Sequence, residues 1–194
     1  MTRDYGEDGF VASESYFDGI GEAVLCAGGY HRVDKTWYDA NHVKSEAWFD
    51  TEGNPMTLNN TFCKREREYD EAGNVSVERY YGEDGEPIAC KDGYDEYRRE
   101  YNEKKQAMTF EYFLGGEPYT RSAGFAVMKR SYDENGLVAV ESYFDAEGKP
   151  VASAAGYHKI KRVWKDKDTV ESEKKYDVDG MEIVPEQPAT DQGE

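Results

Sequence analysis

The chain has 194 residues, of which 41 are Asp or Glu and 24 are Lys or Arg, so its formal net charge is −17. Aromatic residues make up 14% of the chain and include 16 Tyr, which excludes a disordered protein because disordered segments are poor in aromatic residues. The acidic charge excludes a direct grip on a nucleic-acid backbone, since that needs Lys and Arg to neutralise phosphates, and it favours a basic partner.

The N-terminus and the cysteines bear on the compartment. No apolar run approaches the ~18 residues of a membrane span, and residues 1–10 lack the basic segment and apolar core of a secretory signal. Three cysteines are few and odd in number, which argues against a disulfide framework and for a reducing compartment. We expect a cytoplasmic protein, or a surface or secreted one if the chain is a fragment of a longer precursor.

An aromatic residue recurs at a near-constant interval and marks the start of each of six similar units. The interval is 32 residues at every step except the fourth, which is one residue shorter. The six starts are Tyr5, Trp37, Tyr69, Tyr101, Tyr132 and Trp164. This spacing predicts a repeat protein in which residues 1–184 form a single array, each unit burying its apolar face mainly against its neighbours.

Each unit begins with a tight turn, as in the DEAG of residues 70–73 and the DENG of residues 133–136. Asp caps backbone donors at the first corner of a type I turn, and the Gly three residues later takes a positive φ. This predicts a reversal between two strands, with a bulge at the Gly or Asn position.

An alternating run follows each turn, for example VAVESYF at residues 138–144, and this period of two predicts a strand. One face of the strand carries the leading Val or Ala and a closing ring. The closing rings are Phe17, Phe49, Tyr81, Phe113, Phe144 and Tyr176. The other face carries a Glu in five units and, two residues later, a second aromatic residue in five units.

A second turn, a proline and a further strand complete the unit. The turn is again of the Asp-x-x-Gly kind in most units, and the proline (Pro55, Pro87, Pro118 or Pro150) opens the next strand, where a missing N–H is tolerated. A variable segment then leads to another aromatic column and a final strand of about seven residues. That column holds Tyr30, Phe62, Tyr94, Phe125 and Tyr157.

These elements predict an all-β, elongated repeat protein of about six 32-residue β-hairpin units that form a twisted antiparallel meander. A β-solenoid with one unit per coil is the alternative. We prefer hairpins because Asp-x-x-Gly turns reverse the chain sharply, whereas the corners of a solenoid coil need not. Residues 185–194, PEQPATDQGE, have no apolar anchor, so we expect a disordered C-terminal tail.

The alternation of Tyr-Asp-x-x-Gly with Tyr/Phe-Asp-x-x-Gly-x-Pro resembles the tyrosine- and glycine-rich hairpin repeats of bacterial proteins, namely MORN-type repeats and the YD repeats of the Rhs family. The resemblance covers residues 5–184. It departs from those families in two respects: their units are usually shorter, and the Gly-x-Gly texture of MORN repeats is missing. The resemblance implies a β-hairpin array that scaffolds or binds, and it supplies no catalytic residues.

The acidic and aromatic face of the alternating strands is the candidate partner-binding site. Its residues are Glu14, Tyr16, Glu46, Trp48, Glu78, Tyr80, Phe110, Tyr112, Glu141, Tyr143 and Glu173. One interpretation is a ladder that meets a basic, extended partner. The other is structural: each Glu pairs with a Lys or Arg on a neighbouring strand, from the basic runs at residues 64–68, 97–100 and 158–162.

The fourth unit is the least regular. It has Phe110 in place of the Glu, Lys104 and Lys105 in the turn where other units have Gly, and a second turn, LGGEP, that is one residue shorter. We expect this turn to be built differently, and a break in the array or a specific contact to lie in this unit.

Residues that could carry other chemistry do not combine into a site. A column of His31, Cys63, Asp95, Ala126 and His158 contains metal-ligand types, but its members lie one unit apart, too distant to share one ion, and His31 and His158 are expected to be exposed strand residues. Cys26 and Cys90 are equivalent but two units apart, beyond disulfide reach. The Asp-x-x-Gly turns are too short for a calcium loop, and no catalytic motif occurs. We therefore predict no cofactor, no metal and no enzymatic activity.

Three functions fit these observations. The first is a non-enzymatic repeat scaffold that binds another protein, with a basic surface, through the acidic and aromatic face, because exposed Tyr and Trp dominate interface energetics. The second is an acidic nucleic-acid mimic that inhibits a DNA- or RNA-binding protein, as phage anti-defence proteins do. The third is a cell-surface array that binds glycans by aromatic stacking.

Overall fold

The computed structural model describes residues 1–58 and 61–184, so the predicted disordered tail, 185–194, lies outside the described residues. Thirteen strands in the described part form one open antiparallel sheet whose order follows the chain, with β9 attached beside β8. The predicted all-β meander of hairpins is confirmed, and the solenoid alternative is wrong because neighbouring strands are antiparallel. Among the described residues, no helix is long and apolar enough to cross a membrane.

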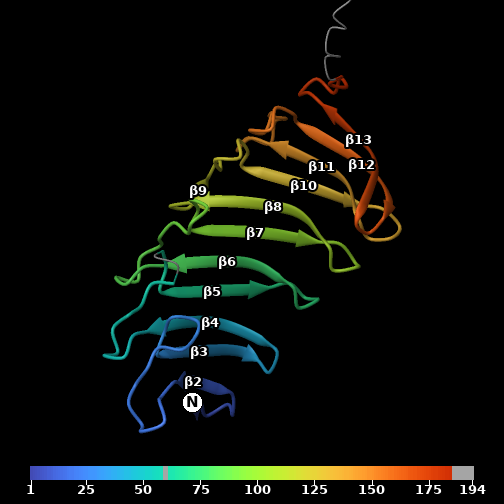
Figure 1. Cartoon of the computed structure of the whole chain (residues 1–194). Helices are drawn as coiled ribbons and strands as arrows, with labels where there is room; N and C mark the ends of the chain where they lie inside the picture. Colours follow the sequence, from blue (N-terminus) through green and yellow to red (C-terminus); the bar gives the residue numbers. More distant parts are fainter. Residues whose placement is uncertain (59–60, 185–194) are drawn as a thin grey trace, which may run out of the picture.

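Consecutive strands form six hairpins. The strands are β1 (Thr2–Tyr5), β2 (Val11–Ser15), β3 (Arg32–Asp39), β4 (His42–Phe49), β5 (Lys64–Tyr69), β6 (Val75–Tyr81), β7 (Glu96–Tyr101), β8 (Ala107–Leu114), β9 (Glu117–Pro118), β10 (Val127–Tyr132), β11 (Val138–Phe144), β12 (Lys159–Asp166) and β13 (Thr169–Tyr176). The hairpin tips lie at one end of the strands and the loops between hairpins at the other (Figure 1). Successive hairpins join through a shorter contact, such as the three residue pairs between β11 and β12.

The tip of the fifth hairpin shows why Asp and Gly recur in the turns. The Asp133 carboxylate accepts the N–H groups of Asn135 and Leu137, both at 2.9 Å, and the Gly136 N–H donates to the Asp133 carbonyl. Gly136 has φ of 82°, which an L side chain adopts only at a cost. This is the predicted type I turn with a bulge at the glycine.

Tips in three units depart from this pattern. In the second and sixth hairpins a two-residue turn connects the strands, since Asp39 pairs with His42 and Asp166 with Thr169. In the fourth hairpin Lys105 occupies the glycine position with φ of 60°. The second turn of the fourth unit is a two-residue turn at residues 115–116 with positive φ at both glycines, as in type I′ turns, so the expected difference in this turn is confirmed.

The loop after each hairpin folds back over one face of the sheet, which we name the covered face. In three units the segment expected to open as a strand at proline makes a single bridge instead, to Phe49, Tyr81 or Phe144. A further turn then carries an aromatic side chain onto the covered face. In the fifth unit, for example, Gly156 donates to the Ser153 carbonyl at 2.8 Å, and the Tyr157 ring packs on that of Tyr143.

The column that includes His31 and Cys63 lies just before the strands, and the expectation that His31 and His158 are exposed strand residues is wrong. Cys63, Asp95, Ala126 and His158 are all buried, His31 is partly buried, and each residue precedes a strand. In the last copy the His158 N–H donates to the Tyr176 carbonyl, while the His158 carbonyl accepts the Tyr143 N–H, both at 2.9 Å. Pairing with strands on both sides is what buries this column.

The first aromatic residue of a unit fastens that unit to the preceding one. Its hydroxyl or indole N–H donates to a backbone carbonyl of the previous hairpin at 2.6 to 2.9 Å. The pairs are Trp37 with Val11, Tyr69 with Val43, Tyr101 with Val75, Tyr132 with Ala107, and Trp164 with Val138. We name this contact the inter-unit clamp. It requires a side chain that is both aromatic and a hydrogen-bond donor.

The left-handed turn positions give a matched pair of stability predictions. Lys105→Gly should stabilise the chain by about 0.5–1 kcal/mol, because it relieves an L side chain at φ of 60°. Gly148→Ala should destabilise it by about 1 kcal/mol, because Gly148 has φ of 77° and an added Cβ would meet nothing that could offset the strain. Urea unfolding measures both, and a destabilised Lys105→Gly variant would contradict this account.

Removal of one clamp hydroxyl should weaken the array measurably. In the wild-type chain the Tyr101 hydroxyl donates to the Val75 carbonyl at 2.8 Å. Tyr101→Phe keeps the ring but removes this hydrogen bond, and should lower the free energy of unfolding by about 1 kcal/mol. Tyr5→Phe is the matched control, since the Tyr5 ring is 62% exposed and its hydroxyl has no partner within the described residues. Equal losses in the two variants would refute the clamp.

Candidate functional site

The aromatic residues of the predicted binding face are buried, not exposed. Trp48, Tyr80, Tyr112 and Tyr143 are only 5–7% exposed, and Tyr16 is partly buried. Their rings alternate with the loop aromatics in a continuous ladder from Trp48 to Tyr157, with centroids 4.6–6.3 Å apart. Each such pair contributes about 0.5–1.5 kcal/mol beyond its buried area. The expectation of an exposed aromatic face is therefore wrong, because the loops cover it.

The glutamates of that face lie in a row of alternating charge that crosses the sheet, one residue per strand. The row reads Arg3, Glu14, Lys35, Glu46, Arg67, Glu78, Arg99, Phe110, Arg130, Glu141, Arg162 and Glu173. Within hairpins the partners are opposite one another, as in Arg67 with Glu78 at 2.8 Å and Arg130 with Glu141 at 2.7 Å. All five glutamates pair with Arg or Lys, so the structural interpretation of the glutamate column is confirmed.

The ladder and the charge row are joined by hydrogen bonds. The hydroxyls of Tyr80 and Tyr143 donate to Glu78 and Glu141 respectively. Burial, together with these carboxylates, raises the pKa of Tyr80 and of Tyr143. A phenol that donates to a carboxylate resists ionisation. These hydrogen bonds therefore stabilise the folded state as long as the two tyrosines are protonated.

Phe110 is the one break in the row. The Arg99 guanidinium lies over the rings of Tyr97 and Phe110, at 4.3 and 5.5 Å from their centroids, and Arg130 approaches Phe110 at 5.0 Å. Cation–π contacts thus take the place of the missing carboxylate. The irregular residue of the fourth unit is accommodated within the sheet.

The opposite face of the sheet is open among the described residues, and cations there lie over the closing rings. Arg32 lies 4.2 Å from the Phe49 ring centroid and Arg98 lies 4.1 Å from that of Phe113. Toward the C-terminal end this face is basic, with four lysines on β10, β12 and β13. They are Lys129, Lys159, Lys161 and Lys174. The strands together hold 18 of the 24 Lys and Arg residues but only 16 of the 41 Asp and Glu residues, so most of the acidic charge lies outside them.

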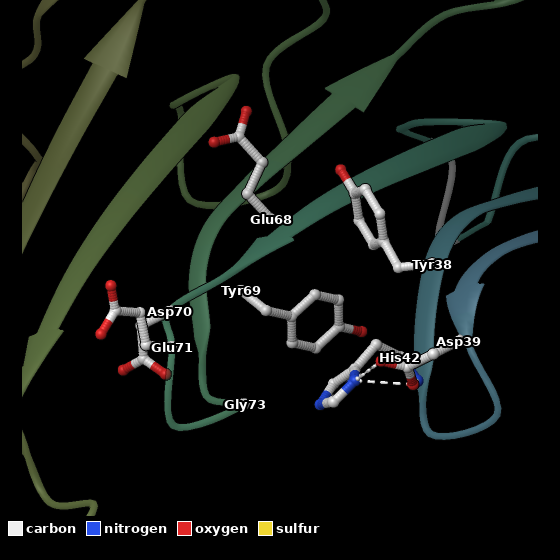
Figure 2. A pocket seen from close by; sticks show the side chains of 8 residues that line it. All are labelled: Tyr38, Asp39, His42, Glu68, Tyr69, Asp70, Glu71 and Gly73. Atoms are coloured by element: carbon white, nitrogen blue, oxygen red, sulfur yellow. Dashed lines mark hydrogen bonds and ion pairs between the residues drawn. The ribbon is translucent and has the colours of Figure 1, made fainter.

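A groove between the tips of the second and third hairpins combines the exposed Tyr38 ring and the partly buried Tyr69 ring with carboxylates. It has a volume of about 450 Å³ and is lined by Tyr38, Asp39, His42, Glu68, Tyr69, Asp70, Glu71 and Gly73. Figure 2 shows the Tyr69 ring between those of Tyr38 and His42, with Asp39 beside His42 and with Glu68, Asp70 and Glu71 set apart from the rings. The Tyr69 centroid is 6.1 Å from that of Tyr38 and 4.6 Å from that of His42, both in edge-to-face geometry.

Local bonds keep the groove acidic. The His42 ring nitrogen lies 2.7 Å from the Asp39 carboxylate, and this hydrogen bond lowers the pKa of Asp39. Hydrogen bonds from Asn74 likewise lower the pKa of Asp70. Glu71 is exposed and forms no ion pair within the described residues. The groove therefore places tyrosine rings and carboxylates together, the combination that attracts an organic cation. Lys44 already lies 5.6 Å from the Tyr38 ring centroid, and Glu68 pairs with Arg79.

Equivalent grooves farther along the array have different linings. The one between the fourth and fifth hairpin tips contains Lys104 and Met108, and the one between the fifth and sixth contains Lys165 and Lys167. The repeat thus builds a similar depression several times and varies its charge. Of these grooves, the one that contains Tyr38 and Tyr69 has four carboxylates and no lysine.

No family model and no curated protein sequence matches the chain. Within residues 1–58 and 61–184, no group of three or more His, Cys, Asp or Glu side chains converges as metal ligands. All three cysteines are free thiols, and Cys63 is buried.

Two features escaped the sequence interpretation although signals for them were present. The clamp column contains Tyr and Trp but never Phe, whereas the closing-ring and loop columns mix Tyr with Phe; that restriction marks a required donor. The groove residues Tyr38 and His42 have no equivalents in the other units, so no recurring column marks them.

The buried tyrosines predict alkaline unfolding. Burial raises the pKa of Tyr97 to about 12, and the pKa values of Tyr80 and Tyr143 are also raised, while an unfolded Tyr ionises near pH ~10. The folded state thus binds more protons above pH ~10, so stability should be complete below that pH and decline as it rises toward ~12. Tyrosinate absorbance should rise together with loss of the circular dichroism signal. Titration of these tyrosines near pH ~10 in the folded chain would contradict this.

Proposed function

We propose that this protein is a non-enzymatic repeat scaffold that binds a protein partner with a basic surface. The observation that carries the proposal is the groove between the second and third hairpin tips, which is lined by two tyrosine rings and four carboxylates. A Lys or Arg side chain of a partner fits it, because its charge gains both from the ring faces and from the carboxylates. This moves the contact from the predicted strand face, whose rings are buried, to the hairpin tips.

The arrangement of the array supports a defined orientation for such a partner. The grooves near the C-terminal end contain lysines, and the open face there is basic as well. Like charges across an interface are unfavourable. A basic partner is therefore directed to the second and third units, and an extended basic segment would run from there along the acidic turns.

A binding test with a lysine-containing tetrapeptide as the probe addresses this proposal. Glu71→Gln should weaken its affinity about two- to fivefold, the effect of one exposed ion pair. Tyr38→Leu should weaken it by a similar factor through loss of the cation–π contact. Glu103→Gln is the matched control, because Glu103 holds the equivalent place in the fourth unit and lines the groove that contains Lys104. NMR shifts of the Tyr38 and Tyr69 ring protons locate the peptide.

The same measurement separates the proposal from a nucleic-acid mimic. A mimic acts through its total charge, so Glu71→Gln and Glu103→Gln would weaken binding equally, with a steep salt dependence. Such a result, or unchanged affinity in both variants, would refute the groove as the contact. The regular carboxylates that suggested mimicry are paired with Arg and Lys, which favours the scaffold.

A further inference from the structure

The two ends of the array carry complementary halves of the contact that joins its units. Five clamp donors bond a carbonyl 25 or 26 residues earlier in the chain. Tyr5 is the sixth donor in the column, and its hydroxyl makes no hydrogen bond within the described residues, where its side chain is 62% exposed. Val170 occupies the next acceptor position after Val138, with no donor in that part of the chain.

The two edge strands of the sheet, β1 and β13, both have exposed backbone that can pair with another strand. β1 is exposed along all four residues, and β13 is exposed at seven of its eight residues. β1 corresponds to the first strand of a hairpin and β13 to the second, so β13 beside the β1 of another chain repeats the contact between β11 and β12. In that register Glu173 corresponds to Glu141 and Met1 to Ile160, which is 1% exposed in the array.

The charge row has the same polarity. It starts with Arg3 on β1 and ends with Glu173 on β13, so a second chain placed head to tail continues the alternation of charge. Within the chain the equivalent contact between units is that of Arg67 with Glu46 at 3.7 Å. Hydrogen-bond donor, strand edge and charge therefore all match in one register.

We propose that a second copy of this chain docks head to tail, with its β1 against β13, so that the array continues from one molecule into the next. The contact consists of two edge-strand residue pairs, Ser172 with Thr2 and Glu173 with Met1, together with the Tyr5 hydroxyl on the Val170 carbonyl and Arg3 beside Glu173. The interface is heterologous, so assembly is open-ended rather than a closed dimer. It is small and therefore weak, and the net charge of −17 on each copy opposes it.

Sedimentation equilibrium on the full chain, over a concentration series at high salt, tests this proposal, since salt screens the long-range repulsion. The average mass should rise with concentration past that of a dimer. Tyr5→Phe should weaken association about 2- to 10-fold, the worth of one neutral hydrogen bond, at unchanged thermal stability. Tyr101→Phe is the matched control, which should lower stability and leave association unchanged.

A second variant acts on the strand edge. The Tyr143 N–H donates to the His158 carbonyl of the next unit. Because N–H groups two residues apart in a strand point to the same side, the Glu141 N–H also points toward the next unit. The equivalent N–H of Glu173 therefore points away from β12, toward the free edge of β13. Glu173→Pro removes that outward donor without breaking the ladder to β12 and should abolish association. A monomer at every concentration, assembly that stops at a dimer, or association unchanged in Tyr5→Phe and Glu173→Pro would each overturn the proposal.

Discussion

The main physical constraint on this structure is that a single-layer sheet must bury enough apolar surface without a second layer packed against it. A sheet of this kind is solvated on both faces unless something covers it, and an isolated hairpin is marginal in water. Here the loops fold back and pack their rings on the strand rings, so that Phe125 lies between Tyr112 and Tyr143. Stability is then a sum of contacts between neighbouring units, as in other repeat proteins.

The covered face is organised in two bands that run across the strands. The rings near the loops form one band and are buried. The charge row forms the second band, two residues farther from the loops along each strand. Tyr80 and Glu78 link the two bands through a buried hydrogen bond. Glu78 is 6% exposed, and its carboxylate accepts hydrogen bonds from both this hydroxyl and Arg67, as a buried polar group requires. The glutamates thus stabilise the sheet. The surfaces that remain for binding are the hairpin tips, the open face and the two edge strands of the array.

Variation between units is concentrated where the sheet tolerates it. The clamp donors keep their chemical character along the chain, while the hairpin tips change in length, in glycine content and in charge. Tip residues such as Tyr38 and Lys104 contact solvent and the neighbouring tip, so their identity affects the grooves more than the fold. A repeat that holds its frame constant and varies its tips is suited to bind different groups at different positions.

The sequence by itself determined the repeat, the all-β hairpin architecture, the turn types and the face on which each strand residue lies, because these follow from local patterns of period two and from Asp and Gly chemistry. Even the anomalous second turn of the fourth unit was predictable. The sequence could not reveal whether a face is covered. Tyr143 has the alternation of an exposed residue, and only the return of the loop carrying Tyr157 buries it. Tyr38 and Tyr69 likewise come together only because successive hairpins lie side by side in the sheet (Figure 2). Burial and convergence are properties of contacts between units, and the tertiary structure decides those.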